Sequence, residues 1–151
     1  MIEFADEPPY QSRMLDKVWS GAAEALREFI VAANDGTSPG AMWSLFAPDV
    51  EFHVPPELPY GGAFRGLEAV KQAHAATRDY YDRIRIEIEQ IICSDDLVLL
   101  YFQFNFRARK NGRTGSFPMI ETFRLADGKV IEWRGFHFAP GAVAAILAAD
   151  G

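Results

Sequence analysis

Glu121 is the residue whose type and setting most strongly suggest chemistry. It follows a period-two strand pattern and is the only charged member of the row Phe117, Met119, Phe123 and Leu125. Burying a carboxylate removes its hydration, so this row predicts either a raised pKa or a compensating partner. Glu121 is therefore either a catalytic acid or base, or a structural carboxyl bonded to a backbone amide or an arginine. The pattern leaves both interpretations open.

The same patterns place two histidines where they can face Glu121. His137 is in phase with Trp133 and Gly135 on the last strand pattern, and His74 lies on the inner stripe of a predicted helix. A carboxyl and an imidazole in one cleft can transfer a proton near neutral pH. Each histidine also has a structural alternative, His137 as a solvent-bonded residue at the mouth of the cleft and His74 as a bonded core residue.

The other histidine and the single cysteine indicate structural roles. His53 alternates with Phe52 and Val54 and faces away from them, which predicts that it holds the loop at Pro55-Pro56. The three histidines have unrelated spacing, so we expect no metal site. Cys93 has no second cysteine for an internal disulfide, and we interpret it as inert packing.

Composition limits the class of protein. The 151 residues suit one domain, with 49% hydrophobic and 24% charged residues, which excludes intrinsic disorder. A net charge of -6 argues against nucleic acid or an anionic membrane as partner, and no segment is apolar for long enough to span a bilayer. We expect a cytoplasmic protein. The 12 phenylalanines predict a large aromatic core or an aromatic pocket.

The first half of the chain is expected to be mainly helical. Residues 1–11 are interpreted as a loose tail and 12–151 as a single domain. A helix is expected over 12–34, ending at Asn34-Asp35-Gly36, and a second, short helix from Ser38-Pro39 with Met42, Leu45 and Phe46. The strand Val50–Val54 and the loop Pro55–Gly66 follow. A third helix is expected over 67–82, with an inner stripe of Leu67, Val70, His74, Thr77 and Tyr81.

The second half is expected to form four antiparallel strands and a terminal helix. Alternation predicts strands at 84–89, 100–107, 117–125 and 130–138, with turns at Ser94-Asp95-Asp96, Asn111-Gly112 and Asp127-Gly128. Phe102, Phe104 and Phe106 should face the helices, and Pro140-Gly141 should open the last helix. These elements predict an α+β domain in which a curved sheet wraps around three N-terminal helices.

Two segments resemble the SnoaL-like group of the nuclear transport factor 2-like superfamily. The first comprises Phe46–Pro55 and Tyr60–Val70, and the second comprises Glu121–Arg124 and Asp127–Arg134. The resemblance covers about residues 14–149 and implies a cone-shaped fold. That fold hosts isomerases, cyclases, dehydratases, epoxide hydrolases and non-catalytic binders, so the resemblance specifies the fold better than the activity.

The resemblance also implies roles for single residues. The protonated oxyanion-hole aspartate of ketosteroid isomerases falls on Glu121, and the tyrosine that supports their hydrogen-bond network falls on His74. Their oxyanion tyrosine falls on Phe29 and their general base on Val54, which argues against steroid isomerisation by that machinery. The acid that SnoaL-like cyclases and limonene epoxide hydrolase carry near the end of the last strand falls on Phe138, although Trp133-Arg134 resembles the hydrolase strand.

Together these observations predict a small enzyme that acts without a cofactor on an apolar cyclic or polyketide-like molecule. Glu121 would be the acid/base or oxyanion-stabilising group, with His74 and His137 tuning or sharing its proton. The pocket walls would be apolar and mostly aromatic, comprising Phe29, Phe52, Val54, Tyr60, Tyr81, Phe102, Phe104, Phe106, Met119 and Trp133.

Two alternatives belong to other functional classes. A non-catalytic binder of a small hydrophobic ligand is favoured by the missing base and opposed by the Glu/His constellation. An interaction module would need an exposed apolar patch on the outer sheet face, where only Val130, Phe136 and Phe138 are suitable. We also expect a homodimer through that convex face, formed by Tyr101, Gln103, Arg107, Ile120, Thr122, Val130 and Phe136.

Overall fold

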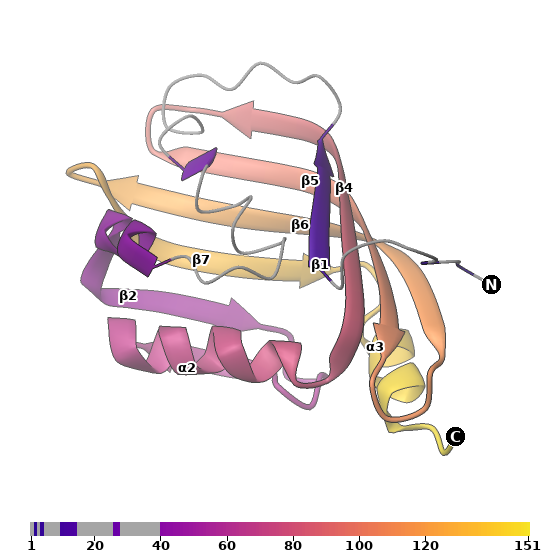
Figure 1. Cartoon of the computed structure of the whole chain (residues 1–151). Helices are drawn as coiled ribbons and strands as arrows, with labels where there is room; N and C mark the ends of the chain where they lie inside the picture. Colours follow the sequence, from indigo (N-terminus) through magenta and orange to yellow (C-terminus); the bar gives the residue numbers. More distant parts are fainter. Residues whose placement is uncertain (1, 3, 5–9, 15–25, 28–39) are drawn as a thin grey trace.

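A strongly curved sheet forms most of the computed structural model, which describes residues 2, 4, 10–14, 26, 27 and 40–151 (Figure 1). The elements of this part of the chain are β1 (Tyr10–Met14), the short 3-10 helix η1 (Gly40–Leu45), β2 (Phe46–Val54), β3 (Gly62–Arg65), α2 (Leu67–Arg78), β4 (Tyr81–Cys93), β5 (Leu97–Ala108), β6 (Thr114–Ala126), β7 (Lys129–His137) and α3 (Pro140–Ala148). The predicted α+β class is confirmed. Among these residues no helix is both long and apolar enough to cross a membrane.

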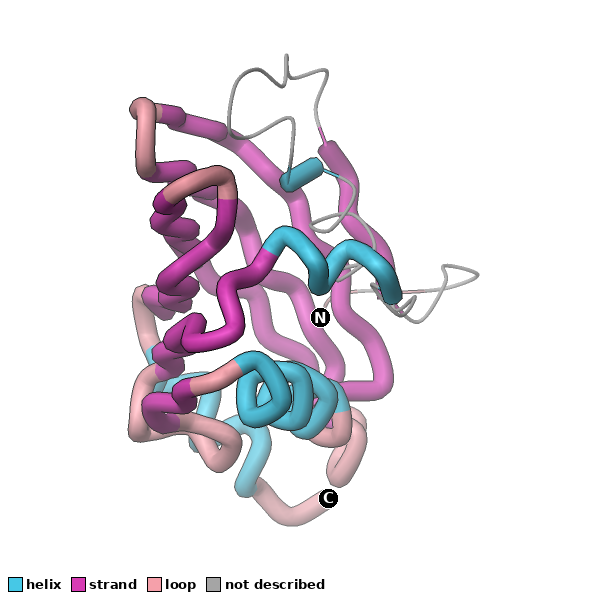
Figure 2. The backbone as a smooth tube through the Cα atoms, turned by 90° about the vertical axis from the view of Figure 1, so that its left-hand side faces the viewer, coloured by secondary structure: helices cyan, strands magenta, loops and turns pink. Residues whose placement is uncertain are grey.

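The strand order explains how the sheet forms a cone. Seven strands of the described chain lie in the order β1-β4-β5-β6-β7-β2-β3. The strands β4 to β7 form the expected antiparallel series, whereas β2 joins β7 and β1 joins β4 in parallel. The helix α2 packs against β2, β3 and β4, so it closes the concave side of the sheet (Figures 1 and 2). The concave side is therefore enclosed between α2 and the central strands.

The alternation along β5 sets which side chains face this interior. Phe102, Phe104 and Phe106 are all buried on the concave side, which confirms the predicted register. Asn105 points the other way but is also buried, with only 4% of its surface exposed. Its amide nitrogen donates to the carbonyl of Arg85 at 3.2 Å, and its amide oxygen accepts from Ser116 at 2.7 Å. These bonds satisfy a buried polar group on the convex side of β5.

The N-terminal expectations need correction. Tyr10–Met14 is a strand, so the predicted helix does not begin at Ser12 and the loose tail does not reach residue 11. Pairing with β4 supplies hydrogen bonds to what would otherwise be an open edge, which outweighs the helical pattern locally. Leu26 and Arg27 are helical as predicted, and residues 15–25 and 28–34 of the expected helix lie outside the described residues.

Other boundaries also differ from the pattern. Phe46 begins β2 instead of ending a helix, and a bulge between Phe46 and Glu51 accommodates Pro48 within that strand. The predicted loop contains β3, and α2 ends at Arg78, so that Tyr81 opens β4.

The orientation of Val130 also differs from the prediction. Val130 is fully buried because a register shift in the β6–β7 ladder turns its side chain inward. It therefore does not belong to the predicted convex surface.

The last helix is held by the hairpin between β5 and β6. Pro140 opens α3 as predicted, and Asn111 in the hairpin donates from its amide nitrogen to the carbonyls of Ile146 and Ala149, both at 2.8 Å. The final carbonyls of a helix have no partner within the helix, so this side chain completes their bonding. The Asn111-Gly112 turn thus also fixes the position of α3.

Candidate active site

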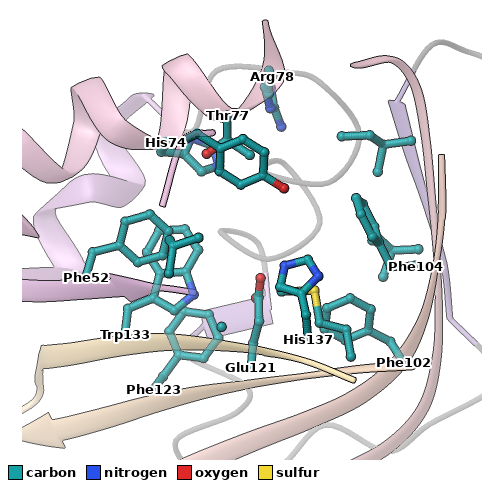
Figure 3. A pocket seen from close by; sticks show the side chains of 16 residues that line it. Phe52, His74, Thr77, Arg78, Phe102, Phe104, Glu121, Phe123, Trp133 and His137 are labelled. Carbon is teal, nitrogen blue, oxygen red and sulfur yellow. The ribbon is translucent and has the colours of Figure 1, made fainter. Parts of the chain in front are cut away.

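A cavity lies between α2 and the concave face of the sheet, with a volume of about 90 Å³. This volume can hold a small molecule or one end of a larger one. Figure 3 shows its polar side chains projecting inward from opposite walls. Sixteen described residues line it: Phe52, Val54, Tyr60, His74, Thr77, Arg78, Ile84, Ile86, Phe102, Phe104, Met119, Glu121, Phe123, Trp133, Gly135 and His137.

Glu121 projects from β6 into this cavity (Figure 3). In the ladders it pairs with Leu100 on β5 and with Gly135 on β7, so its flanks are apolar. Burial raises the pKa of this carboxyl from its ordinary 4.5 to about 7, and the nearby Trp133 side chain lowers it in part. Glu121 is therefore present in both protonation states near neutral pH, which a group that donates and accepts a proton requires.

Trp133 is held firmly by its aromatic neighbours. Its ring stacks on Phe52 with centroids 4.3 Å apart and on Phe123 with centroids 5.4 Å apart. Stacked rings restrict the indole, so its N–H keeps a fixed direction relative to Glu121. The interaction of the indole with Glu121, which lowers the pKa of this carboxyl in part, is thus pre-organised by the packing of β2, β6 and β7.

The two predicted histidines both line the cavity and are both neutral at pH 7. Burial lowers the pKa of His137 to about 4, and burial together with the charge of Arg78 lowers that of His74 to about 4. The His137 ring meets Phe104 edge-on at 5.8 Å, and its Nδ1 has no hydrogen-bond partner among the described residues. His74 lies between Trp43 and Trp133, at 5.7 and 5.6 Å.

The two histidines lie at different positions relative to Glu121. His137 is diagonal to Glu121 across the β6–β7 ladder, because Met119 pairs with His137 and Glu121 with Gly135. The two side chains point into the cavity side by side (Figure 3). His74 enters from α2, on the opposite wall. The structure therefore brings all three predicted groups to one cavity, while their catalytic roles stay predictions.

A tight turn brings Tyr60 to the cavity. Backbone bonds from Leu58 N–H to the Pro55 carbonyl (3.2 Å) and from Gly61 N–H to the Leu58 carbonyl (2.9 Å) fold the chain back on itself. A Cβ at Gly61 would lie 1.9 Å from the Pro55 oxygen, so only glycine fits there. The buried Tyr60 hydroxyl shares a hydrogen bond with the Tyr81 hydroxyl, and burial raises the pKa of both tyrosines.

Seven of the ten wall residues predicted from sequence line the cavity: Phe52, Val54, Tyr60, Phe102, Phe104, Met119 and Trp133. Tyr81 lies behind Tyr60, fully buried, because α2 ends before it and β4 turns it into the core. Phe106 is also core, since its ring covers Gly115, where a Cβ would come within 2.4 Å of it. Phe29 lies outside the described residues.

Sequence reasoning missed six lining residues: Thr77, Arg78, Ile84, Ile86, Phe123 and Gly135. Thr77 belongs to the predicted inner stripe of the helix, and Phe123 belongs to the same strand row as Glu121. Both could therefore have been predicted from the sequence as cavity residues. Arg78 follows Thr77 at the end of α2 and enters the cavity because the helix stops there. Gly135 carries no side-chain signal, and only its pairing with Glu121 shows its importance.

Outside the cavity, one described cluster has the residue types of a metal site. The side-chain ligand atoms of Glu51, His53 and Glu132 lie within 4.8 Å of one another. Both carboxylates already have cationic partners, since Arg65 lies 3.6 Å from Glu51 and Arg134 lies 2.9 Å from Glu132. The Nε2 of His53 contacts Glu51 at 3.3 Å. The cluster is therefore an ion-pair network, and we assign it no metal.

Comparisons with known proteins agree with this architecture. The sequence profile of the SnoaL-like domain matches residues 26–133. A nuclear transport factor 2-like protein of unknown function from Burkholderia pseudomallei is 20% identical, with a TM-score of 0.76 over 86% of this chain and 99% of that one. A putative SnoaL-like polyketide cyclase from Jannaschia is 19% identical, with a TM-score of 0.73 over 89% and 99%.

A third solved structure has a similar fold. It is TerC co-crystallised with polyporic acid, 20% identical, with a TM-score of 0.72 over 86% of this chain and all of TerC (100%). At these identities the likeness concerns the fold alone. No curated protein matched the chain.

Proposed function

Because the chain belongs to the SnoaL-like domain family, which includes polyketide cyclases and isomerases, we propose that it is an enzyme acting without a cofactor on a small apolar ring-containing or polyketide-like molecule. The observation that carries this proposal is the carboxyl of Glu121, which projects into an aromatic cavity and has a pKa of about 7. The cavity supplies the low-polarity surroundings in which one acid acts strongly on a bound carbonyl.

The chemistry that fits best is proton transfer next to a carbonyl group. Protonated Glu121 would donate to the carbonyl oxygen and stabilise the enolate that forms when the neighbouring C–H loses its proton. His137, which is neutral and lies beside Glu121, would accept the proton from the C–H group or share that of Glu121. The two residues by which β2 lines the cavity, Phe52 and Val54, have no titratable group. The group that accepts the C–H proton would therefore come from another element of the cavity wall.

A non-catalytic ligand binder is the second candidate. The specific observation in its favour is that, of the described titratable groups in the cavity, only Glu121 has a pKa near neutrality, because both histidines fall to about 4. A binder needs the apolar walls and one hydrogen-bonding group, and both are present. The two candidates differ in whether Glu121 turns substrate over.

Deuterium exchange into 2-indanone tests the proposal directly. This small aromatic ketone has exchangeable α-protons, and proton NMR in D₂O follows their loss. We expect the protein to accelerate exchange and Glu121→Gln to lower the rate by about a hundredfold, because the variant keeps the shape but cannot transfer the proton. Glu132→Gln is the matched control, since this carboxylate pairs with Arg134 outside the cavity. Ligand binding without acceleration by the wild type would favour the binder.

A further inference from the structure

The cavity has a second group of polar side chains, at the C-terminal end of α2. Arg78 lies in the last turn of α2, and its Nη2 is shielded from solvent. Tyr60 reaches the same region, because its hydroxyl bonds Tyr81, the first residue of β4 after that helix. Both Arg78 and Tyr60 line the cavity. Figure 3 shows Arg78 on the helical wall and Glu121 with His137 on the sheet wall.

Tyr60 has hydrogen-bonding capacity beyond its bond to Tyr81. A phenol hydroxyl offers one donor and two acceptor sites, and two hydroxyls that share a bond use only one of their two hydrogens. When Tyr81 donates, the Tyr60 hydrogen is available, and within the described residues Tyr60 has no other hydrogen-bond partner. Burial raises the pKa of Tyr60, so the hydroxyl stays protonated and remains a donor over the whole physiological range.

Arg78 adds a permanent positive charge to this wall. A guanidinium has five N–H donors in a planar fork and no acceptor, so it can serve a protein partner and a ligand together. Its charge is felt inside the cavity, because it contributes to the lowered pKa of His74. Thr77 beside it donates its hydroxyl to the Ala73 carbonyl at 3.0 Å, so this hydrogen does not compete for the ligand.

We propose that Tyr60 and Arg78 form an anion-binding subsite, the donor subsite, and that the substrate is a ring compound with an acidic oxygen, a carboxylate, enolate or phenolate, at the end remote from Glu121. The inference rests on the proposed function in one respect, that the same cavity holds the substrate. Two donors of which one is cationic match an acceptor that carries negative charge. Anchoring that end orients the molecule so that its other end lies beside Glu121.

The donor subsite predicts a preference between two probes of equal shape. Isothermal titration calorimetry would compare trans-cinnamate with cinnamamide, which differ in charge and not in size. We expect the wild type to bind cinnamate at least about tenfold more tightly, the usual contribution of a hydrogen bond to a charged group. Arg78→Gln should abolish the preference and Arg78→Lys should restore part of it. Arg124→Gln, which removes a charge paired with Asp96 outside the cavity, should keep it.

Tyr60→Phe tests the hydroxyl separately, with Tyr80→Phe as matched control. Tyr80 is exposed, with its ring 5.5 Å from that of Tyr60, and it does not line the cavity. We expect about a tenfold loss of cinnamate affinity for Tyr60→Phe and none for Tyr80→Phe. Equal binding of both probes, equal effects of the two Phe variants, or no binding of cinnamate at millimolar concentration would each overturn the inference. A cinnamate preference together with an exchange rate indifferent to Glu121→Gln would overturn the proposed function alone.

Discussion

Glu121 pairs with Gly135 across the β6–β7 ladder, and this pairing creates the open space in front of the carboxyl. A Cβ at Gly135 would meet one neighbouring atom within 4 Å among those described, the terminal methyl of Met119 at 3.0 Å. Any side chain at this position would therefore project into the cavity next to Glu121. A glycine opposite the acid is thus part of the site, although it contributes no functional group.

Gly135→Val should consequently remove ligand binding without unfolding the protein. Valine suits a strand, and the Met119 methyl is the flexible end of a side chain that can move aside. We expect at least a tenfold loss of cinnamate affinity, measured by calorimetry, and a melting temperature within a few degrees of the wild type. Thr122→Val, on the neighbouring strand and on the opposite face of the sheet, is the control. Unchanged affinity in the Gly135 variant would show that the ligand binds elsewhere.

Glu121 should also affect how stability depends on pH. Its folded pKa of about 7 lies above its unfolded value near 4.5, so the folded state holds the extra proton between these pH values. The contribution is full below pH 4.5 and is lost as pH rises through 7. It amounts to about 3 kcal/mol, at 1.36 kcal/mol for each pKa unit. His74 and His137 act oppositely, since their lowered pKa values make their contribution disappear as pH falls from about 6.5 to 4.

The effect of Glu121 is therefore isolated by the difference in the free energy of unfolding between the wild type and Glu121→Gln. Urea unfolding at pH 4, 5.5, 7 and 8 would give this difference at each pH, and the two histidine contributions cancel because both proteins contain them. We expect the wild type to lose stability relative to the variant as pH rises from 4.5 to 7. A difference that is constant over this range would show that the Glu121 pKa is not raised.

If the enzyme proposal holds, the rate should follow the same titration. We expect kcat/KM for 2-indanone exchange to change once between pH 5 and 9, with an apparent pKa near 7, because both histidines stay neutral throughout. The rate falls with rising pH when Glu121 acts as the acid and rises when it acts as the base. Glu121→Gln should make the residual rate independent of pH here. A pKa that persists in this variant would assign the titration to another group.

Gly115 provides a prediction about the core. The Phe106 ring covers this glycine, and a Cβ there would lie 2.4 Å from the ring. Gly115→Ala should destabilise the protein by about 1–3 kcal/mol, the usual cost of overpacking a core. Denaturant unfolding measures this loss, and Gly141→Ala, where a Cβ meets nothing within 4 Å, is the control. Equal effects of the two substitutions would contradict the packing argument.

The convex face predicts the state of assembly. Tyr101, Ile120 and Phe136 lie in register on β5, β6 and β7, and Phe136 is 50% exposed. We propose that this row is the centre of a homodimer interface. Phe136→Glu should give a monomer in sedimentation equilibrium at micromolar concentration, because it places an unpaired charge at the centre. Ile92→Glu, at the end of β4, should leave the dimer intact, and a monomeric wild type would contradict the proposal.

The sheet and the positions of the three titratable groups could be predicted from the sequence, because alternate residues of a strand point to opposite faces of the sheet. The apolar residues of each strand therefore indicate which face lies against the core. The sequence pattern located Glu121, His74 and His137 on the cavity walls, and the register of Phe102 and Phe104 was correct. It failed where pairing decides the structure: β1 and β3 form because neighbouring strands offer free edges. A register shift between β6 and β7 also turns Val130 to the face opposite to the one predicted, and such a shift cannot be recognised from the local sequence pattern.

The alternation along β6 has a consequence for how this protein can change. Met119, Glu121 and Phe123 face the cavity, while Ile120, Thr122 and Arg124 between them face the opposite side. Substitutions at odd positions change the cavity wall, and substitutions at even positions change the convex face, with the same backbone serving both. The cavity and the proposed dimer interface can therefore vary independently in the course of evolution, although the residues that form them are adjacent in the chain.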